Sequence, residues 1–328
     1  MYERRSGGTG RSRLDRRFLR RAEDLVAGPE YDTELRSAAF AFLDLLARHY
    51  PGPLRFEHLA QFRFDGERIP LLDHQRGIRK PRQLEAALSF RTVHAARPED
   101  RPYDDEPGPD GYLRYKWRGS DPEHPENRAL RRALEYRLPM VWFRGVAPGL
   151  YMPVYPVWLA DEEAFAEQFV VALDEEELYR WDQADSLDPS SQRRYAERVA
   201  RVRLHQPLFR ERVLLSYETS CAVCRFRHRE LLDAAHILPD SEGGEPVVPN
   251  GIALCRLHHA AFDHFMMTVR PDYRVEVRAD LLAEADGPTL RHGLQELHGQ
   301  LITLPRQRAA RPDRALLDAR YERFRAAS

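Results

Sequence analysis

The segment from residue 221 to residue 263 reads CAVCRFRHRELLDAAHILPDSEGGEPVVPNGIALCRLHHAAFD, and it contains all three cysteines of the 328-residue chain. Cys221 and Cys224 are separated by two residues, and Cys255 stands at the same spacing before His258. Two such pairs within one short window have the ligand spacing of a tetrahedral zinc site. We therefore expect these four side chains to hold one structural Zn²⁺.

A second set of polar residues lies between the two zinc-ligand pairs and directly after them. The stretch Asp233-Ala-Ala-His236 has the pattern of a strand that ends at a loop, and Asn250 precedes a second apolar stretch. His259 and Asp263 follow in an expected helix, where their four-residue spacing places them on one face. The pattern predicts a divalent-metal site on this helix, facing the strand that carries His236.

These residues resemble the HNH endonuclease family, whose fold is the ββα-metal arrangement, over roughly residues 217–270. The resemblance implies that His236 is the general base that deprotonates the water attacking a phosphodiester. It implies that Asn250 orients this histidine or steadies the loop. It further implies that His259 and Asp263 bind the catalytic cation, Mg²⁺ or Mn²⁺, and that the four zinc-spaced residues form the structural zinc site of the family.

One position departs from the family pattern. Many members carry a carboxylate or a histidine immediately before the base, where this chain has Ala235. Asp233 lies three residues before the base, and whether it joins the metal stays open. Two alternatives to an active nuclease are a zinc ribbon used only for binding and a DNA-binding protein with an inactive HNH fold. The ribbon needs none of the polar residues around the zinc site, and Ala235 is the only support for the inactive fold.

The composition is that of ordinary packed domains. Hydrophobic residues make up 42% and aromatic residues 10% of a length that suggests two domains. Because no apolar run is long enough to span a bilayer, we expect no transmembrane helix, and the first residues lack the apolar stretch of a secretory signal. Three clustered cysteines fit no disulfide framework, so we expect a cytoplasmic protein.

The charge balance is nearly even. The chain has 51 basic and 52 acidic residues, so a DNA-binding surface would require basic groups gathered in patches. Only Lys80 and Lys116 are lysines, and all other basic residues counted here are arginines. Arginine suits bidentate phosphate contacts, but a compositional bias of the genome explains this excess better.

The pattern along the chain suggests four parts. Residues 1–21 are expected to form a flexible basic arm, and residues 22–173 a DNA-recognition domain. The acidic and polar residues 174–191 mark a linker, and residues 192–328 hold the HNH domain with its zinc site and C-terminal helices. Pro207 is expected to break the first helix of this last part.

Within the front part, the apolar pattern changes from helical to strand-like. Residues 32–50 have helical spacing, whereas residues 55–173 read as short strands and turns. Residues 112–117 alternate between apolar and basic side chains, and a hairpin is expected around a five-residue loop at 145–149. Asn127 is the expected N-cap of a helix. Together these features predict a mixed β-barrel with one or two helices.

Several phrases of the front part resemble bacterial restriction endonucleases of the SRA-HNH kind, in which an SRA-like barrel of the PUA superfamily precedes the HNH domain. The phrases are Arg76-Gly-Ile-Arg-Lys-Pro81, Arg114-Tyr-Lys-Trp-Arg-Gly119, Asn127-Arg-Ala-Leu-Arg131 and Tyr136-Arg-Leu-Pro-Met-Val-Trp-Phe-Arg-Gly145. The resemblance implies an α+β chain that cuts duplex DNA containing 5-methylcytosine or a related modified cytosine, flipped into a pocket of the barrel. The first rival reads a different mark, such as a phosphorothioate backbone.

The DNA-contacting residues of the front part can be named only as candidates. The candidates are Arg76, Arg79, Lys80, Arg82, Lys116 and Trp117. The aromatic residues that could stack on a base are Tyr115, Trp117, Trp142, Tyr151, Tyr155 and Trp158. Each aromatic residue taken singly is more typical of a packed core. Because a double-strand break needs two active sites or two visits, a homodimer is also a hypothesis.

Overall fold

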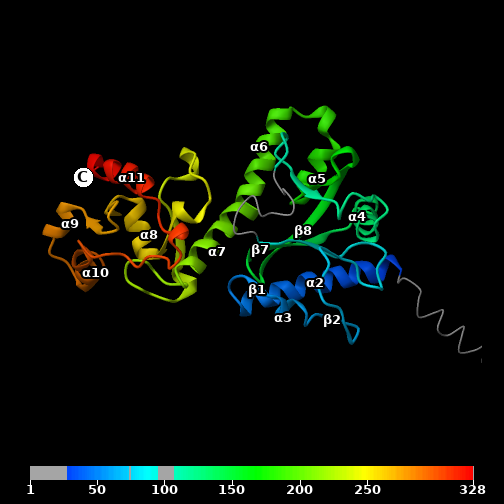
Figure 1. The fold of residues 1–328 in the computed structure, drawn as a ribbon, viewed down its shortest axis with the longest axis horizontal. Coiled ribbons are helices and arrows are strands. Elements are labelled where there is room, and N and C mark those ends of the chain that lie inside the picture. The colour runs from blue at the N-terminus through cyan, green and yellow to red at the C-terminus, as the bar shows by residue number, and fades with distance from the viewer. Residues whose placement is uncertain (1–27, 74, 95–106, 328) are drawn as a thin grey trace, which may run out of the picture.

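The computed structural model describes residues 28–73, 75–94 and 107–327, and this part of the chain has two halves joined by one long helix (Figure 1). The basic arm predicted for residues 1–21 lies outside the described residues. No helix in the described ranges combines the length and the apolar character needed to cross a membrane. Helices and strands are mixed, in agreement with the predicted α+β class.

A mixed seven-stranded sheet forms the centre of the front half. Six strands lie in the spatial order β4 (Ile78–Arg79), β5 (Ser89–Thr92), β7 (Met140–Ala147), β8 (Leu150–Glu163), β9 (Gln168–Ala172) and β6 (Leu113–Lys116). The short β1 (Leu54–Arg55) pairs with the beginning of β8. The sheet curls, so that Tyr115 of β6 donates its hydroxyl to the Arg91 carbonyl of β5 at 3.2 Å. The predicted mixed sheet is present, whereas its identity as an SRA-like barrel stays a prediction.

β7 and β8 form the predicted hairpin, but its loop is shorter than the sequence indicates. Gly145 pairs with Tyr151 and Ala147 pairs with Leu150, so strand pairing continues through residues expected as loop. A β-bulge between Gly145 and Ala147 takes up the irregularity, and Gly149 turns the chain at φ +71°. The prediction of a five-residue loop is therefore wrong, because the β-bulge lets the pairing of β7 with β8 extend toward the turn.

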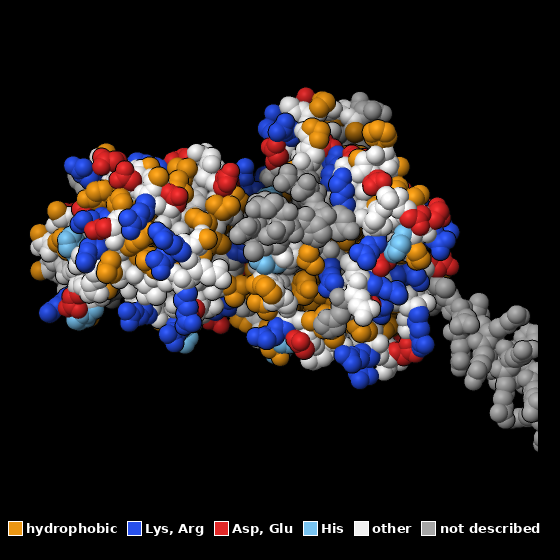
Figure 2. Space-filling model, in the orientation of Figure 1, with side chains coloured by type: hydrophobic (Ala, Val, Ile, Leu, Met, Phe, Trp, Pro, Cys, Tyr) orange, Lys and Arg blue, Asp and Glu red, His pale blue; other side chains and the backbone are white. Residues whose placement is uncertain are grey.

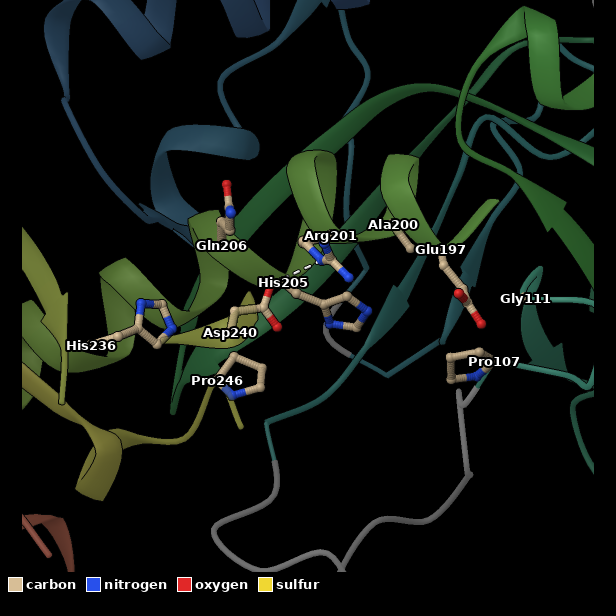
Figure 3. Close-up of a pocket in the computed structure, with 10 residues that line it drawn as sticks. All are labelled: Pro107, Gly111, Glu197, Ala200, Arg201, His205, Gln206, His236, Asp240 and Pro246. Carbon is tan, nitrogen blue, oxygen red and sulfur yellow. Dashed lines mark ion pairs between the residues drawn. The ribbon is translucent and has the colours of Figure 1, made fainter. Parts of the chain in front are cut away.

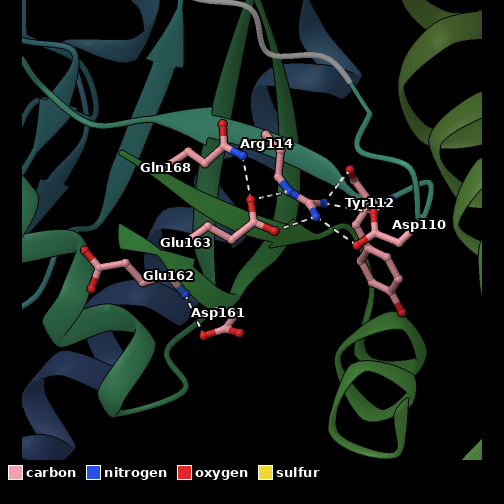
Figure 4. Close-up of polar contacts among 7 residues, drawn as sticks. All are labelled: Asp110, Tyr112, Arg114, Asp161, Glu162, Glu163 and Gln168. Atoms are coloured by element: carbon pink, nitrogen blue, oxygen red, sulfur yellow. Dashed lines mark hydrogen bonds and ion pairs between the residues drawn. The ribbon is translucent and has the colours of Figure 1, made fainter. Parts of the chain in front are cut away.

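The predicted alternation along β6 is confirmed. Leu113 and Tyr115 belong to a buried hydrophobic cluster. Arg114 lies between them in the sequence and contacts a group of polar and acidic side chains (Figure 4). The buried Arg114 guanidinium forms ion pairs with Asp110 at 2.8 Å and with Glu163 at 2.7 Å. A buried guanidinium needs such partners, because an unpaired buried charge is strongly destabilising. The pairs fix β6 against the end of β8.

Two helices cover opposite faces of the sheet. α2 (Pro29–His49) packs in the hydrophobic cluster that contains Phe143, and α4 (Pro125–Glu135) packs in the cluster that contains Trp142. Trp142 and Phe143 are neighbours on β7, and successive side chains of a strand point to opposite faces. β7 is therefore enclosed between the two helices.

The N-cap of α4 is His124 and not Asn127. The Nδ1 atom of His124 accepts a hydrogen bond from the Glu126 amide at 3.2 Å. Asn127 is buried inside the first turn, where its side chain accepts from the Arg118 amide at 2.7 Å and donates to the Asp121 carbonyl at 2.8 Å. The predicted cap was wrong because the asparagine fixes the preceding loop through its side-chain amide.

The acidic residues 174–191 are folded against the front half. They include α5 (Glu175–Asp182), whose Trp181 packs against the small hydrophobic cluster at the edge of the sheet. The Tyr112 hydroxyl donates to the Glu177 carbonyl at 3.1 Å. The acidic run thus supplies the first turn of a helix, where carboxylates are favourable. The position of the boundary between the domains stays a prediction.

One continuous helical unit, here called the connecting helix, joins the two halves (Figure 1). It consists of α6 (Pro189–Ala200), a π-helical segment (Arg201–His205) and α7 (Gln206–Ser216). The break expected at Pro207 is wrong. Proline cannot donate a backbone N–H and its ring crowds the preceding turn, but here the wider π turn lies directly before it and the helix continues.

The connecting helix is buried in both halves of the protein. Leu204 and Leu208 belong to the hydrophobic cluster of the front sheet. Phe209 and Val213 belong to the cluster of the C-terminal half. Because Leu208 and Phe209 are adjacent, the two cores meet within one residue of the helix.

The C-terminal half is built around the predicted ββα unit. β10 (Leu232–His236) and β11 (Gly251–Cys255) pair antiparallel, and α8 (Arg256–Asp263) follows β11 directly. The remaining elements are β12 (Met267–Val269), β13 (Val275–Val277), α9 (Ala279–Ala283), α10 (Pro288–Gly293) and α11 (Arg314–Ala327). The C-terminal helices predicted for this part of the chain are therefore present.

Candidate nuclease site and metal centre

The four residues with zinc-ligand spacing come together in space. One ligand atom from each of Cys221, Cys224, Cys255 and His258 lies within 4.8 Å of all the others. The Nδ1 atom of His258 is 3.1 Å from the Cys255 sulfur and 3.5 Å from the Cys221 sulfur. Three thiolates and one imidazole are a donor set that suits tetrahedral Zn²⁺. The cluster could therefore hold the predicted metal ion.

The fourth ligand of this cluster is oriented by the C-terminal segment. The other ring nitrogen of His258, Nε2, lies 2.7 Å from the carbonyl oxygen of Gly293 at the end of α10. A metal-bound histidine commonly donates its second N–H to a carbonyl, which fixes the ring and its tautomer. The contact makes Nδ1 the nitrogen that faces the three sulfurs.

His236 is the last residue of β10, opposite Gly251 of β11. Its ring stacks on Phe209 of the connecting helix, with 4.0 Å between the ring centroids and 19° between the planes. A Cβ atom at Gly251 would lie only 2.9 Å from the Phe209 ring, so glycine is required for this approach. Burial lowers the pKa of His236, with the charge of His259 adding to the effect and Asp240 opposing it. The imidazole is therefore neutral at neutral pH, as a general base must be.

Asn250 contacts the loop after the histidine and not its ring. Its Oδ1 atom accepts from the Leu238 amide at 2.8 Å, and its Nδ2 atom donates to the carbonyls of Leu238 and Glu245 at 3.0 Å each. The side chain is 1% exposed. A Cβ atom at Gly244 would lie 1.9 Å from the Leu238 carbonyl oxygen, so the loop is closely packed here. Of the two roles implied by the resemblance, these contacts favour steadying the loop.

His259 lies between two carboxylates. Its Nδ1 atom is 3.4 Å from Asp233 Oδ2, and its Nε2 atom is 3.3 Å from Asp263 Oδ2. The hydrogen bond to Asp233 raises the pKa of His259 despite burial. Burial opposes the charge on Asp233, but the hydrogen bonds from His259 and the Ala234 amide outweigh it and lower its pKa. Imidazole and carboxylate ligands at this position could hold a divalent cation.

The position of Asp233 follows from the pleat of β10. Asp233 and Ala235 are two residues apart, and side chains at that spacing point to the same face of a strand. Asp233 therefore lies on the same face of β10 as Ala235, the position where many HNH members carry a carboxylate or a histidine. The structure thus brings Asp233 to His259, a contact that the sequence had left open.

The connecting helix supplies a second contact to this group. Arg210, next to Phe209, lies with its Nε atom 3.4 Å from Asp233 and donates to the Leu232 carbonyl at 2.8 Å. It also pairs with the buried Glu211 at 2.7 Å. Sequence reasoning missed both Phe209 and Arg210, because helical spacing alone explains an apolar and a basic residue on such a helix.

The last helix supplies a buried arginine behind the site. Arg320 of α11 is 4% exposed and donates to the carbonyls of Ile237 and Phe262. Its guanidinium carbon lies 3.6 Å from the centre of the Phe262 ring. Ile237 directly follows His236, and Phe262 directly precedes Asp263. One side chain therefore ties the strand of the histidine to the helix of the carboxylate, and no sequence pattern pointed to it.

A cavity of about 270 Å³ opens beside His236 (Figure 3). The connecting helix forms one wall, with Arg201 paired to Asp240 of the loop after β10 at 2.9 Å. Pro107 and Gly111 of the front half form another wall. The front half, the connecting helix and the ββα unit therefore meet next to the candidate base.

The basic candidates of the front half do not line this cavity. Arg79, Lys80 and Lys116 donate to backbone carbonyls of their own half. Arg82 forms an ion pair with Glu67 at 2.9 Å, and the side chains of both Arg82 and Arg76 are exposed. Arg76 and Arg82 are thus the members of this set most open to a partner.

The aromatic candidates lie mainly inside the front half. Trp117 is 5% exposed, and the guanidinium of Arg131 lies 5.8 Å from the centre of its ring. The other buried members of the set are Tyr115, Trp142 and Trp158. Tyr151 and Tyr155 are half-buried, and the Tyr155 hydroxyl donates to Asp44 at 2.8 Å. Stacking of Trp117 on a base would therefore require the surrounding core to open.

Comparison with known proteins identifies the C-terminal half. Residues 221–270 match a family model described as HNH endonuclease, which confirms the predicted enzyme class. The chain is similar to the solved structure "Modification dependent TagI restriction endonuclease", with 18% identity over 73% of this chain and 82% of that chain and a TM-score of 0.26. It is also similar to the solved structure "Structure of the Type IV phosphorothioation-dependent restriction endonuclease ScoMcrA". The identity is 15% over 56% of this chain and 51% of that chain, and the TM-score is 0.23. No curated protein matches the chain.

Proposed function

We propose that this chain, a DNA endonuclease of the HNH type, cuts duplex DNA only where the DNA carries a chemical mark, 5-methylcytosine or a related modified cytosine. The observation that carries the proposal is the junction at Phe209. The connecting helix leaves the core of a separate front half and places Phe209 directly on His236. A front half whose core holds the same helix that contacts His236 can make cutting depend on what that half binds.

The nuclease half accounts for cleavage but not for choice of target. Contacts to phosphate position a protein on DNA and carry no direct sequence information. The residues gathered at His236, His259 and Asp263 are suited to phosphodiester hydrolysis and to no reading of bases. We therefore assign recognition to the front half, on the resemblance of its phrases to SRA-type domains, which read a flipped base.

In the proposed reaction, neutral His236 removes a proton from the water that attacks the phosphorus atom. His259 and Asp263 would hold a Mg²⁺ or Mn²⁺ ion, which when bound offsets negative charge on the phosphate and the leaving oxygen. Asp233 holds the other ring nitrogen of His259, and Asn250 keeps the loop after the base in place. A Zn²⁺ in the Cys3His cluster would stabilise the fold around them.

Two further expectations belong to this proposal. A reducing cytoplasm would keep the three cysteines available as zinc ligands. A double-strand break requires a second active site or a second visit, so a homodimer on the DNA would suit the reaction.

The proposal is tested by digestion of three plasmids of identical sequence: unmodified, methylated at cytosine, and phosphorothioated. With Mg²⁺ or Mn²⁺, the full chain should cut the methylated plasmid and leave the unmodified one largely intact. His236→Ala should lower the cleavage rate by roughly 10²–10⁴-fold. His264→Ala is the matched control, because His264 is exposed beside Asp263 and outside the proposed set. Cutting of the phosphorothioated plasmid alone would show that the recognised mark is a phosphorothioate and not a modified cytosine. Equal cutting of all three plasmids would refute mark dependence.

A further inference from the structure

A second cavity, of about 300 Å³, lies in the nuclease half at the C-terminal end of the connecting helix. Three arginines line it: Arg225 and Arg227 from the segment after the first cysteine pair, and Arg306 from the loop before α11. None of them belongs to the candidate active site or to the Cys3His cluster. The cavity therefore gathers basic side chains from two segments that are far apart in the sequence.

The positive charge at this cavity is only partly neutralised by the protein. Arg306 pairs with Glu218 at 2.5 Å, and both side chains are largely exposed. Arg225 and Arg227 are exposed and form no ion pair within the described part of the chain. Elsewhere in the same half, Arg270, Arg278 and Arg291 each pair with a nearby carboxylate. The cavity thus keeps about two uncompensated positive charges in a chain whose net charge is −1.

The basic groups of the whole surface do not by themselves indicate where DNA lies. On the visible face, Lys and Arg side chains are spread over both halves (Figure 2). The cavity combines a concave shape with two arginines, Arg225 and Arg227, that form no ion pair within the described residues. Guanidinium groups present several N–H donors in a planar fork that matches the oxygens of a phosphate.

The cavity is held at a fixed position relative to the candidate base. Tyr217, which lines it, follows Phe209 by eight helical positions, or about 12 Å at 1.5 Å per residue. The loop of Arg306 is tied to the cysteine segment by the Thr303 amide, which donates to the Ala222 carbonyl at 2.7 Å. Phosphates of one DNA strand are spaced about 3.4 Å along the duplex axis. A duplex running along the connecting helix would therefore have about three to four nucleotides between a phosphate at His236 and one at the cavity.

We propose that Arg225, Arg227 and Arg306 form a phosphate-binding subsite that holds the DNA backbone a few nucleotides from the scissile bond. The subsite deepens the proposed function, because it rests on DNA being the substrate. It is independent of the mark, since a backbone contact reads neither the base nor its modification. It contributes affinity and register, and it leaves the choice of target to the front half.

The test measures binding of a short unmodified duplex by the full chain in a His236→Ala background, so that neither cleavage nor a mark enters the readout. Fluorescence anisotropy over a range of salt concentrations gives the slope of log K against log salt. Changing Arg225, Arg227 and Arg306 together to Ala should reduce this slope by about 0.9 per lost phosphate contact, or about 2 to 3 in total. The same three positions changed to Lys should retain most of the slope.

The matched control removes the same charge from the same half. Arg270, Arg278 and Arg291 changed together to Ala should leave the slope nearly unchanged, because each is paired with an acid. Equal loss of slope in the two triple variants would overturn the subsite. If Ala at 225 and 227 releases zinc, Arg227→Gln decides, since Arg227 is exposed, forms no ion pair within the described residues and is none of the four zinc-spaced residues. An unchanged slope in that variant would overturn the proposal, even if the enzyme still cuts marked DNA selectively.

Discussion

The rings of Phe209 and His236 are stacked, with 4.0 Å between their centroids and 19° between their planes. Phe209 belongs to the helix that leaves the front half, and His236 is the candidate general base of the nuclease half. The stack removes water from one face of the imidazole, and burial is the main cause of its lowered pKa. The orientation and the protonation of the base therefore both depend on the connecting helix.

Replacing Phe209 with Leu should move the pH dependence of cleavage. A base acts in its neutral form, so the single-turnover rate rises as pH rises through the pKa of His236 and is level above it. Burial holds this pKa below the ordinary value of 6.5, and Phe209→Leu admits water and raises it. The acidic limb of the rate profile should therefore shift to higher pH, while DNA affinity stays the same. A reduced rate with an unshifted limb would show that the stack only stabilises the fold.

Loss of any one cysteine should unfold the nuclease half. Cys221→Ser, Cys224→Ser or Cys255→Ser removes a ligand from a cluster that the structure shows assembled. Structural Zn²⁺ can contribute on the order of 10 kcal/mol to folding. Elemental analysis should find about one tightly held zinc per wild-type chain and much less in each variant, together with a lower unfolding temperature. A zinc-free protein that folds cooperatively and cuts DNA would contradict this assignment.

Changing Asp233 to Asn should weaken binding of the catalytic cation. The asparagine keeps the size of the side chain but removes the charge that holds His259 Nδ1. Loss of such an orienting partner typically costs about 10–100-fold in metal affinity. Titration of Mn²⁺ by electron paramagnetic resonance should show this loss, and higher Mn²⁺ should restore part of the cleavage. Asp272→Asn, an exposed carboxylate paired with Arg270, is the control. Unchanged Mn²⁺ affinity in Asp233→Asn would remove Asp233 from the metal site.

Replacing Arg320 with Met should lower the rate of cleavage without lowering DNA affinity. Arg320 is too deeply buried to touch DNA, but it holds Ile237 and Phe262 on either side of the site. Leaving the Ile237 carbonyl without this donor costs about 1–3 kcal/mol, whereas the Phe262 carbonyl keeps the Phe265 amide at 3.2 Å, so thermal unfolding should also shift. Arg320→Lys keeps the charge, and because it reaches one carbonyl it should recover part of the rate. Arg325→Met, an exposed change on the same helix that breaks only a pair with Glu322, should leave the rate intact. Equal rates in Arg320→Met and wild type would refute the positioning role.

The zinc cluster and the ββα unit could be predicted because their information is local. Cysteine spacing and the four-residue interval between His259 and Asp263 fix ligand geometry within short segments. The contact between Asp233 and His259, which the sequence analysis left open, could also have been predicted. The two-residue period of a strand places Asp233 on the same face as Ala235. Phe209, Arg210 and Arg320 could not be predicted, because they reach the site only through long-range packing that no local pattern encodes.

The front half was predicted in outline and missed in detail for the same reason. Strand periodicity indicated the hairpin, but it could not show that a bulge near Gly145 extends the pairing. Residue preference pointed to Asn127 as a cap, whereas tertiary contacts use it to hold a loop. Pro207 signalled a break that the π turn before it avoids. In each case, a local preference was overridden by backbone geometry that depends on neighbouring elements.

The central claim is that the front half makes the nuclease depend on a mark, and its most direct test is binding without cleavage. The full chain carrying His236→Ala should be titrated with methylated and unmethylated duplexes of one sequence at moderate salt. The account predicts about tenfold or tighter binding of the methylated duplex, a difference of about 1.4 kcal/mol or more. A mispaired modified base should bind more tightly still, because less pairing energy is lost on flipping. Equal affinity for the methylated and unmethylated duplexes would contradict the account.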